Sequence, residues 1–478
     1  MRCIVTKLSE IASNNFSLSP SNYNTISDGN VERIKLKDLL DRPLEKSDNG
    51  SDVGFSAYLS QSDYYFMRAK SLDSKFYTPM PFGEAVVAMN KKKFQQYNLK
   101  KGDILISKDS NIGECVILSM DMPNFMPCGA LYRLPLSKNK LYILAMIKSS
   151  DFRSQLDKIV PIGATIRHAG KKFLECTIPF PTNNREKTIQ NIEKLVAQVV
   201  EIEQLIIDKD NEIFNKILNE LLNGCKKDIV NLSVKTNLSE IIESDRLDAG
   251  YYSPMAKKQK AILSNYEYGF HTLEEMGYTI KRGQNLQISN IGKSIYSSTF
   301  KEGYYTVIKP TNFSDYGAVE SFEYLGNKNQ LITLNEGDIV FSGEGTVGKC
   351  VLFTDTQEKW ITNIHGIVLH KEKANLLESA FVACFLRFLR KWGYYDHFTV
   401  GGQGGSLGKN YWDAVLIPNM PSEVKNEIAD LYLAKETNIN KFKKMGIIQL
   451  DKIKKEIESK LSLLIGEITS EGNFPRSV

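Results

Sequence analysis

Two long, charged segments of the chain carry apolar residues at alternating spacings of three and four. In the first segment these positions are Ile192, Leu195, Val199, Ile202, Ile206, Ile213 and Ile217. In the second segment they are Ile428, Leu431, Leu450, Ile453, Ile457 and Leu461, with a weak middle around Gly446. A narrow apolar seam flanked by polar residues is what two helices need to pack along their lengths. We therefore predict two long helices that pair antiparallel.

Helix length distinguishes this prediction from an alternative in which each helix is amphipathic and lies on a globular domain. A helix over residues 184–222 would extend about 58 Å at ~1.5 Å per residue. That is longer than a small domain covers, so the length favours a coiled coil. An interruption at Lys444-Met445-Gly446 argues against an unbroken second helix.

Shorter apolar runs alternate with polar turns elsewhere, and one such pattern occurs twice. Residues 102–116 match residues 337–351 without a gap, at an offset of 235 residues. In each copy two apolar runs flank a glycine-containing turn, which predicts a β-hairpin. Ile178-Pro179 has its counterpart in Ile417-Pro418 at nearly the same offset, and a heptad segment follows each. The pattern predicts a repeat of about half the chain, in the order domain, helix, domain, helix.

The helical spacing of apolar residues in 141–159, and in the counterpart 377–392, predicts a supporting helix in each domain. The expected fold class is α+β, with two tandem domains, mostly β with supporting helices, separated by long helices that form an antiparallel coiled coil. The expected boundaries are 1–182 and 229–421 for the domains, 183–228 and 422–466 for the helical spacers, and 467–478 for a disordered tail.

Composition adds little. The 61 Lys and Arg against 56 Asp and Glu give a net charge of only +5, which neither indicates nucleic acid nor excludes a local basic face. The seven cysteines are scattered, without a C-x-x-C pair or a signal peptide, which favours reduced thiols in a cytoplasmic protein. No zinc or other metal site is expected, and no apolar stretch is long enough to span a membrane.

One motif resembles a nucleotide-binding loop. Residues 343–350 fit the pattern G-x-x-x-x-G-K and follow a predicted strand. Cys350, however, occupies the position of the magnesium-binding Ser or Thr, a strand follows instead of a helix, and the repeat has Glu114 in place of the lysine. We therefore predict a hairpin turn and no cofactor. The chain also lacks the usual amino-methyltransferase tetrapeptide, so we expect no catalytic residues.

Candidate DNA contacts lie in the predicted hairpin turns and in basic or amide-rich stretches without acidic residues. Arg and Lys suit phosphates and guanine edges, and Asn and Gln suit adenine. The stretches 165–172 and 401–410 precede the two Ile-Pro elements and are the stronger candidates, although a solvated charge run is the alternative for each. The candidate contacts are Lys91, Lys92, Lys108, Asn111, Thr165, Arg167, His168, Lys171, Lys281, Arg282, Gln284, Asn285, Thr346, Lys349, Gln403, Ser406, Lys409 and Asn410.

The order of these elements resembles the specificity subunit of type I restriction-modification systems. The resemblance is carried by Gly-Asp-Ile-Leu-Ile-Ser and Ile-Gly within 102–113, a Gly/Thr-rich loop, Ile-Pro-x-Pro and a long heptad helix, all repeated once. It covers essentially the whole chain. The segment 246–254, Arg-Leu-Asp-Ala-Gly-Tyr-Tyr-Ser-Pro, is also similar to an opening common in such subunits, and 17–23 is its candidate equivalent.

The resemblance implies two target-recognition domains, each of which recognises half of a split site in double-stranded DNA. It further implies helical spacers that set the gap between the half-sites and bind two methyltransferase subunits, with a motor-nuclease subunit joining for restriction. Such a protein is itself non-catalytic. Because the two domains differ in most loop residues, we expect an asymmetric site. The alternative is a scaffold protein whose two modules on a coiled coil assemble protein partners without DNA.

Overall fold

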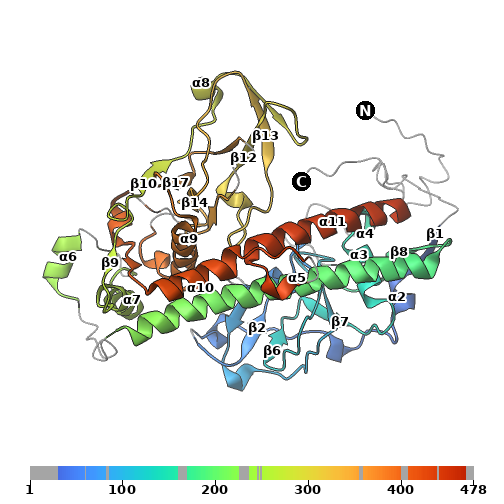
Figure 1. The fold of residues 1–478 in the computed structure, drawn as a ribbon. Helices are drawn as coiled ribbons and strands as arrows, with labels where there is room; N and C mark the ends of the chain where they lie inside the picture. Colours follow the sequence, from blue (N-terminus) through green and yellow to red (C-terminus); the bar gives the residue numbers. More distant parts are fainter. Residues whose placement is uncertain are drawn as a thin grey trace. The chain divides into compact units, whose positions relative to one another are not determined.

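A computed structural model describes residues 31–59, 61–81, 85–159, 169–225, 236–244, 247, 250–354, 359–399, 407, 409–438 and 441–469. These residues form two compact units. The first contains the described residues up to Gln204 together with those from Ile453 onward, and the second contains those from Leu205 to Lys452. Each unit has its own sheets and helices (Figure 1).

The first unit is built on three small sheets. In the first, β1 (Val31–Lys35) pairs antiparallel with β8 (Thr177–Pro181). In the second, β2 (Tyr65–Met67) lies between antiparallel β3 (Val86–Ala88) and parallel β6 (Phe125–Pro127). In the third, β4 (Ile104–Ser107) lies between β5 (Cys115–Ile117) and β7 (Leu131–Leu134), both antiparallel. The helices are α2 (Leu36–Leu39), α3 (Lys140–Ile147) and α4 (Ser150–Ile159).

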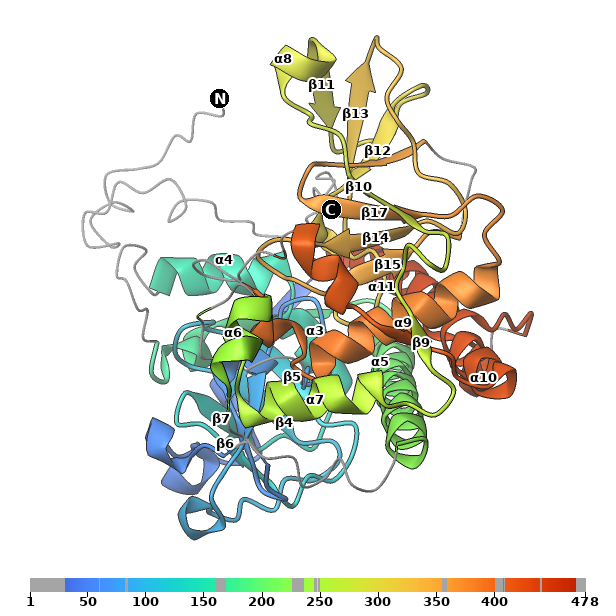
Figure 2. The same cartoon turned by 90° about the vertical axis from the view of Figure 1, so that its left-hand side faces the viewer.

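The second unit repeats this plan with two added strands. Here β9 (Phe270–His271) pairs with β18 (Ile417–Pro418). The next sheet has the order β11 (Ser294–Ser297), β13 (Glu323–Asn327), β12 (Tyr305–Ile308), β16 (Trp360–Thr362). The third has the order β10 (Thr279–Arg282), β17 (Gly366–His370), β14 (Ile339–Ser342), β15 (Cys350–Leu352), whose strands lie side by side in Figure 2. The helices are α6 (Leu238–Ser244), α7 (Pro254–Ser264), α8 (Ile288–Ile291), α9 (Leu376–Lys391) and α10 (Ser422–Leu433).

The sheet order of the two units confirms the internal repeat and the α+β fold class. In each unit the predicted hairpin is antiparallel, and its first strand also pairs with the second strand after the hairpin, β4 with β7 and β14 with β17. In each unit a parallel pair joins two strands far apart in the sequence, β2 with β6 and β12 with β16. Among the described strands, β10 and β11 have no counterpart in the first unit.

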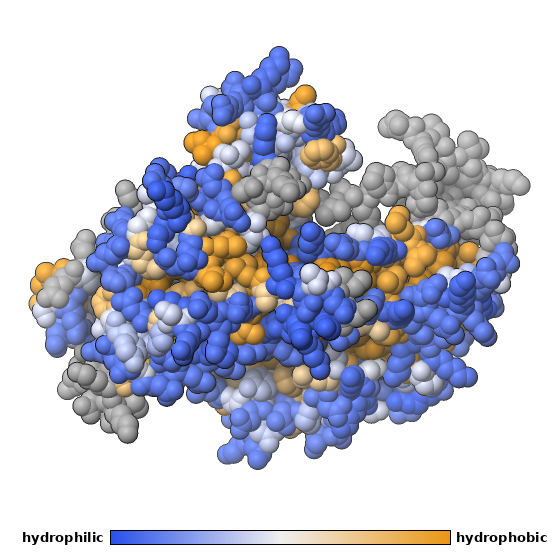
Figure 3. All heavy atoms as spheres, in the orientation of Figure 1, coloured by the Kyte–Doolittle hydropathy of each residue, from blue (hydrophilic) through white to orange (hydrophobic). Residues whose placement is uncertain are grey.

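The first long helix, α5 (Arg185–Asn223), is continuous over 39 residues. Within the first unit, its N-terminal part runs antiparallel to the C-terminal part of α11 (Ile447–Thr469) (Figure 1). Hydrophilic residues cover the outward side of α5 (Figure 3). Among the described residues, no helix is both long and apolar enough to cross a membrane.

Three residues of the predicted apolar seam are less buried than the heptad spacing predicts. Leu195, Leu431 and Ile453 are only partly buried, whereas Val196 and Tyr432 are fully buried. A straight α-helix has 3.6 residues per turn, so its buried face drifts away from a strict 3.5-residue repeat. The other predicted seam residues are buried: Ile192, Val199, Ile202, Ile206, Ile213, Ile217, Ile428, Leu450, Ile457 and Leu461.

The second helical segment is broken. Helix α10 ends at Leu433, and α11 begins at Ile447 after a short 3₁₀ turn over Phe442–Lys444. Gly446 allows the two backbones to meet, because a Cβ at this position would lie 2.6 Å from the Tyr432 carbonyl oxygen and 2.5 Å from the Ala434 nitrogen. The interruption predicted near this glycine is therefore confirmed.

Two other expectations need correction. Residues 467–469, expected in the disordered tail, belong to α11, because Ile465 and Ile468 continue its buried face. The helix expected over 141–159 is two helices, α3 and α4, separated at Ser149. The Ser149 hydroxyl donates to the Met146 carbonyl at 2.6 Å and accepts from the Phe152 amide at 3.3 Å, which ends one helix and starts the next.

Candidate nucleic-acid interface

The turn between the hairpin strands has the same backbone hydrogen bonds in both units. In the first unit the Ser107 amide donates to the Glu114 carbonyl at 2.8 Å, and the Gly113 amide donates to the Ser107 carbonyl at 2.8 Å. In the second unit the Ser342 amide donates to the Lys349 carbonyl at 2.7 Å, and the Gly348 amide to the Ser342 carbonyl at 3.1 Å. Residues 343–350 therefore form a hairpin turn that leads into a strand, as the sequence predicts.

A second shared contact fastens the end of a loop to each turn. The Ala169 amide donates to the Lys108 carbonyl at 3.0 Å, and the Leu407 amide donates to the Gly343 carbonyl at 2.9 Å. Lys108 and Gly343 are equivalent positions of the repeat. Each loop that precedes an Ile-Pro element therefore ends on the hairpin turn of its own unit. The candidate contacts Thr165, Arg167, His168, Gln403 and Ser406 lie in these loops, outside the described residues.

A third shared element is a glycine that lies against the same sheet. The Gly50 amide donates to the Leu131 carbonyl at 2.9 Å, and the Gly283 amide donates to the Gly366 carbonyl at 2.8 Å. A Cβ would lie 2.1 Å from the Cys128 carbonyl oxygen at Gly50, and 2.3 Å from the Asn363 carbonyl oxygen at Gly283. Only glycine allows this approach.

The internal repeat found in the sequence does not pair these two glycines. Their offset is two residues shorter than that of the hairpins, so an ungapped alignment does not pair them. Pairing Gly50 with Gly283 makes Asn49 the counterpart of Arg282, because each directly precedes its glycine. The signal available in the sequence was the glycine itself, 52 residues before Gly102 in the first half and 54 residues before Gly337 in the second (102 − 50 and 337 − 283).

These elements form what we call the turn face of each unit. In the first unit it comprises residues 46–51, 108–114, 132 and 169–171. In the second unit it comprises residues 281–285, 343–349, 365–367 and 407. Arg153 in α4 and Arg390 in α9 support the two turns in the same way, by donating to the carbonyl oxygens of Ile112 and Val347.

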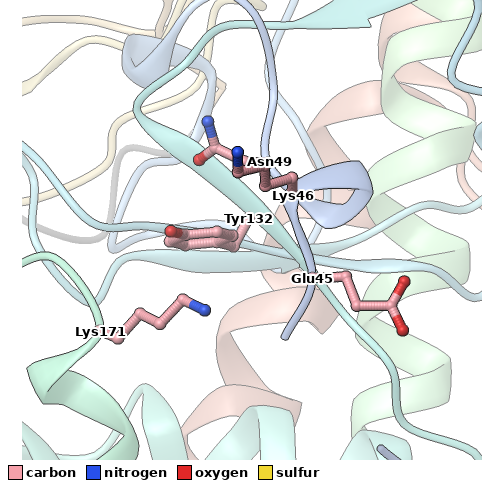
Figure 4. Close-up of a pocket in the computed structure, with 5 residues that line it drawn as sticks. All are labelled: Glu45, Lys46, Asn49, Tyr132 and Lys171. Carbon is pink, nitrogen blue, oxygen red and sulfur yellow. The ribbon is translucent and has the colours of Figure 1, made fainter. Parts of the chain in front are cut away.

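The turn face of the first unit holds a cationic cavity of about 320 Å³, lined by Glu45, Lys46, Asn49, Tyr132 and Lys171 (Figure 4). The Nζ atom of Lys108 lies 5.0 Å from the centre of the Tyr132 ring, and Lys171 donates to the Leu44 carbonyl at 2.9 Å. Burial raises the pKa of Tyr132, which keeps its hydroxyl neutral.

Three lysines thus gather around one tyrosine in this unit. The structure brings the predicted residues Lys108 and Lys171 together and adds Lys46, which the sequence comparison missed because it lies next to Glu45. Asn111 is exposed on the same turn.

The turn face of the second unit carries an arginine–glutamate–histidine chain. Arg282 Nη1 donates to Glu344 Oε1 at 2.7 Å, and His365 Nδ1 lies 2.7 Å from Glu344 Oε2. Hydrogen bonds from Arg282 and His365 hold the pKa of Glu344 below its usual range, against the opposing effect of burial. All three side chains are partly exposed, so this hydrogen-bonded series of residues lies at the surface of the protein.

The remaining candidates of the second unit take different roles. Gln284 Oε1 accepts from the Ile332 amide at 3.0 Å, and Asn285 Oδ1 accepts from the Gln287 amide at 3.1 Å. The Thr346 hydroxyl lies 2.9 Å from the Ser342 hydroxyl. Lys349 Nζ lies 3.1 Å from Asp315 Oδ2 and donates to the Phe313 carbonyl, so its charge is used within the unit.

Five candidates take no part in the turn contacts described above. Lys91 and Lys92 are exposed on a 3₁₀ turn (Lys91–Lys93), where Lys91 Nζ is 5.6 Å from the centre of the Tyr64 ring. Lys409 and Asn410 begin the 3₁₀ helix Lys409–Ala414, and their side chains are outside the described set. Lys281 is exposed on β10, beside Arg282.

The chain matches no protein-family model and no curated protein. Among solved structures, it aligns with the S subunit of a type I restriction-modification system from M. genitalium, at TM-score 0.39 and 14% identity, over 94% of this chain and 98% of that chain.

It also aligns with a chain from a structure on complex assembly and conformational transition of the type I R-M system, at TM-score 0.28 and 11% identity, over 93% and 99% of the two chains. A third alignment is with the HsdS subunit from Thermoanaerobacter tengcongensis, at TM-score 0.27 and 12% identity, over 94% and 98%.

Proposed function

We propose that this chain is the DNA-specificity subunit of a type I restriction-modification complex and that it binds a bipartite, asymmetric DNA site. The observation that carries the proposal is the pair of turn faces. Both use the same backbone hydrogen bonds at equivalent positions, yet the side chains on them differ: Asn49 against Arg282, and Tyr132 against Ile367. A common backbone with different side chains suits two modules that recognise two different half-sites.

The chemistry of the faces supports a DNA ligand. Lys46 and Lys171 line one cavity, and the ammonium group of Lys108 lies near the ring of Tyr132, which lines the same cavity; all three can contact phosphate oxygens. Arg282, Gln284 and Asn285 supply the side-chain types that bind purine edges in the major groove. The Gly/Thr-rich loops end on the same turns. In this proposal phosphate contacts come mainly from the lysines, and base contacts come from the amide and guanidinium groups.

The protein partners of this proposal are two methyltransferase subunits and a motor-nuclease subunit, with the chain itself non-catalytic and cytoplasmic. The seam residues predicted to bind partners are mostly buried by the chain itself. We therefore assign partner binding to the exposed positions of α5 and α11, such as Glu186, Glu201 and Lys460. Their charged side chains lie beside the apolar seam and remain accessible.

The proposal is tested by selecting bound sequences from randomised duplex DNA, with the chain alone and with its methyltransferase subunit. We expect two short conserved motifs of different sequence, separated by a gap of fixed length, and an affinity that falls steeply with salt. Sequencing the methylated positions of the host genome with and without the gene should give the same motif. A chain that binds a methyltransferase but has no sequence preference in either experiment would instead be a scaffold, and the proposal would fail.

A further inference from the structure

We propose that Arg282 recognises a guanine base in the half-site bound by the second unit and that Glu344 positions it for this contact. The inference rests on the proposed function and names the base and the residue. Guanine presents two acceptors, O6 and N7, in the major groove, and the paired N–H groups of an arginine bind both at once.

The hydrogen bonds of Arg282 occupy one end of its guanidinium group. Nη1 donates to Glu344 Oε1 at 2.7 Å and to the Ile364 carbonyl at 3.0 Å, so both hydrogens on this nitrogen are used. Within the described part of the chain, Nε and Nη2 have no hydrogen-bond partner. The side chain is 52% exposed. An arginine held in this way presents the Nε–Nη2 edge, with two roughly parallel donors, to a ligand.

Glu344 is fixed from its other side, which makes it a firm support. Its second carboxylate oxygen lies 2.7 Å from His365 Nδ1, so the carboxylate bridges a histidine and an arginine. The depressed pKa of Glu344 keeps it ionised at neutral pH. An ionised carboxylate attracts the guanidinium and holds its plane, which reduces the conformational entropy that Arg282 would lose on binding a base.

The stretch of sequence around Arg282 is basic, a composition that suits a polyanion. Residues 276–301 contain Lys281, Arg282, Lys293 and Lys301 and no Asp or Glu. Gly283, directly after Arg282, packs its backbone against the carbonyl oxygens of Thr362 and Asn363, which fixes the position from which the arginine extends. The Leu407 amide bonds the carbonyl of Gly343, which precedes Glu344, the partner of the arginine.

The equivalent position of the first unit differs chemically. Asn49 donates from Nδ2 to the Gly50 carbonyl at 2.8 Å, and its Oδ1 is buried without a hydrogen-bond partner among the described residues. No guanidinium extends from this position. The two half-sites should therefore differ at the base pair that Arg282 contacts.

The experiment compares the wild-type chain with Arg282→Gln, Arg282→Lys and Lys281→Gln in selection from randomised duplex DNA, followed by binding to the selected site and its single-base variants. The wild-type motif should contain an invariant G·C pair in one half-site. Arg282→Gln should lower the preference for that pair about tenfold to a hundredfold and leave the other half-site unchanged. Arg282→Lys should do nearly the same, since an ammonium lacks the paired donors. Glu344→Gln should weaken the preference at the same pair.

The neighbouring Lys281→Gln is the matched control, because it removes one charge from the same strand. It should weaken binding to all sequences about equally. The unchanged half-site shows in the same experiment that each variant is folded. An Arg282→Gln chain that keeps the G·C preference, or that loses affinity uniformly as Lys281→Gln does, would overturn the inference while the proposed function survives. A wild-type chain with no bipartite motif would overturn both.

Discussion

The carboxylate of Glu203 in α5 lies 3.3 Å from the ammonium group of Lys454 in α11, and the two side chains are only 1% and 6% exposed. The Oε2 atom of Glu203 accepts three hydrogen bonds: from the Tyr77 amide at 2.9 Å, from the Thr78 amide at 2.8 Å and from the Thr78 hydroxyl at 2.9 Å. One buried acid therefore joins both long helices to the globular part of the first unit. Burial raises the pKa of Glu203, and Lys454 and the Thr78 hydrogen bonds oppose the rise.

We expect Glu203→Ala to destabilise the first unit by about 3–5 kcal/mol, because it removes the acceptor of three donors and one of the two carboxylates that pair with the buried Lys454 ammonium. Lys454→Met should cost a similar amount, since it leaves the carboxylate uncompensated. The three tryptophans, Trp360, Trp392 and Trp412, all lie in the second unit, so hydrogen exchange of peptides from the first unit is the suitable measurement. The double variant should lose clearly less than the sum of the single losses. Additive losses would show that the pair is not coupled.

Gly50→Ala and Gly283→Ala should each disturb one half-site only. At both positions the new methyl group would overlap a backbone carbonyl, which costs about 1–3 kcal/mol and displaces the turn face. Selection from randomised DNA should show that Gly50→Ala weakens one motif and Gly283→Ala the other. Gly54→Ala is the control, because its φ of −73° suits alanine and the nearest atom is 3.8 Å away. Equal effects of all three substitutions would contradict the geometric argument.

Lys108→Gln and Lys171→Gln should weaken binding to all DNA sequences. Each should also reduce the steepness of log affinity against log salt concentration by about one unit. In the proposed complex both ammonium groups, which lie near Tyr132, contact phosphates. Affinity measured over a series of salt concentrations gives the slope. Lys349→Gln should leave the slope unchanged, since its charge is paired with Asp315, and should lower the thermal stability instead. A change of sequence preference in either cavity variant would indicate base contact.

The second unit should lose stability through His397 as the pH falls below 6.5, the ordinary pKa of histidine, toward the lower pKa of the folded state. Its Nε2 lies 3.0 Å from Gln259 Oε1, and burial lowers its pKa below the ordinary 6.5, with Lys260 acting in the same direction and Asp396 opposing. Above pH 6.5, His397 is neutral in both the folded and the unfolded chain, so it does not lower the free energy of unfolding. As the pH falls, the unfolded chain takes up the proton first, and stability is lost down to the pKa of the folded state.

His397→Gln should reduce this loss, because glutamine does not titrate. Urea unfolding followed by tryptophan fluorescence reports on the second unit at each pH. His271→Gln, which changes a half-exposed ring, is the control. If the wild-type chain and His397→Gln lose stability in parallel, another group is responsible.

Much of the local structure could be predicted from the sequence. The hairpins, the repeat and the long first helix follow from the spacing of apolar residues and glycines, because that spacing fixes which side of a strand or helix is buried. The same spacing predicted the break near Gly446. It failed at Leu195, where one residue of drift moved the buried position to Val196.

The candidate site depended more on tertiary structure. Lys108 and Lys171 both lie near Tyr132, and the Ala169 amide bonds the Lys108 carbonyl across a sequence separation that no local pattern predicts. Lys349 looks like a phosphate ligand in the sequence, but it is paired with Asp315.

The sequence by itself determined the doubled plan and the elements of each half, since these depend on local periodicity and backbone preference. Tertiary structure alone decided which basic side chains keep donors accessible to a ligand and which use their donors within the fold. Arg282 and Lys349 are both basic residues of the repeat, and only the packing around them separates their roles. The physical reason is that hydrogen bonds and ion pairs form between residues far apart in the chain, and no spacing rule encodes such distances.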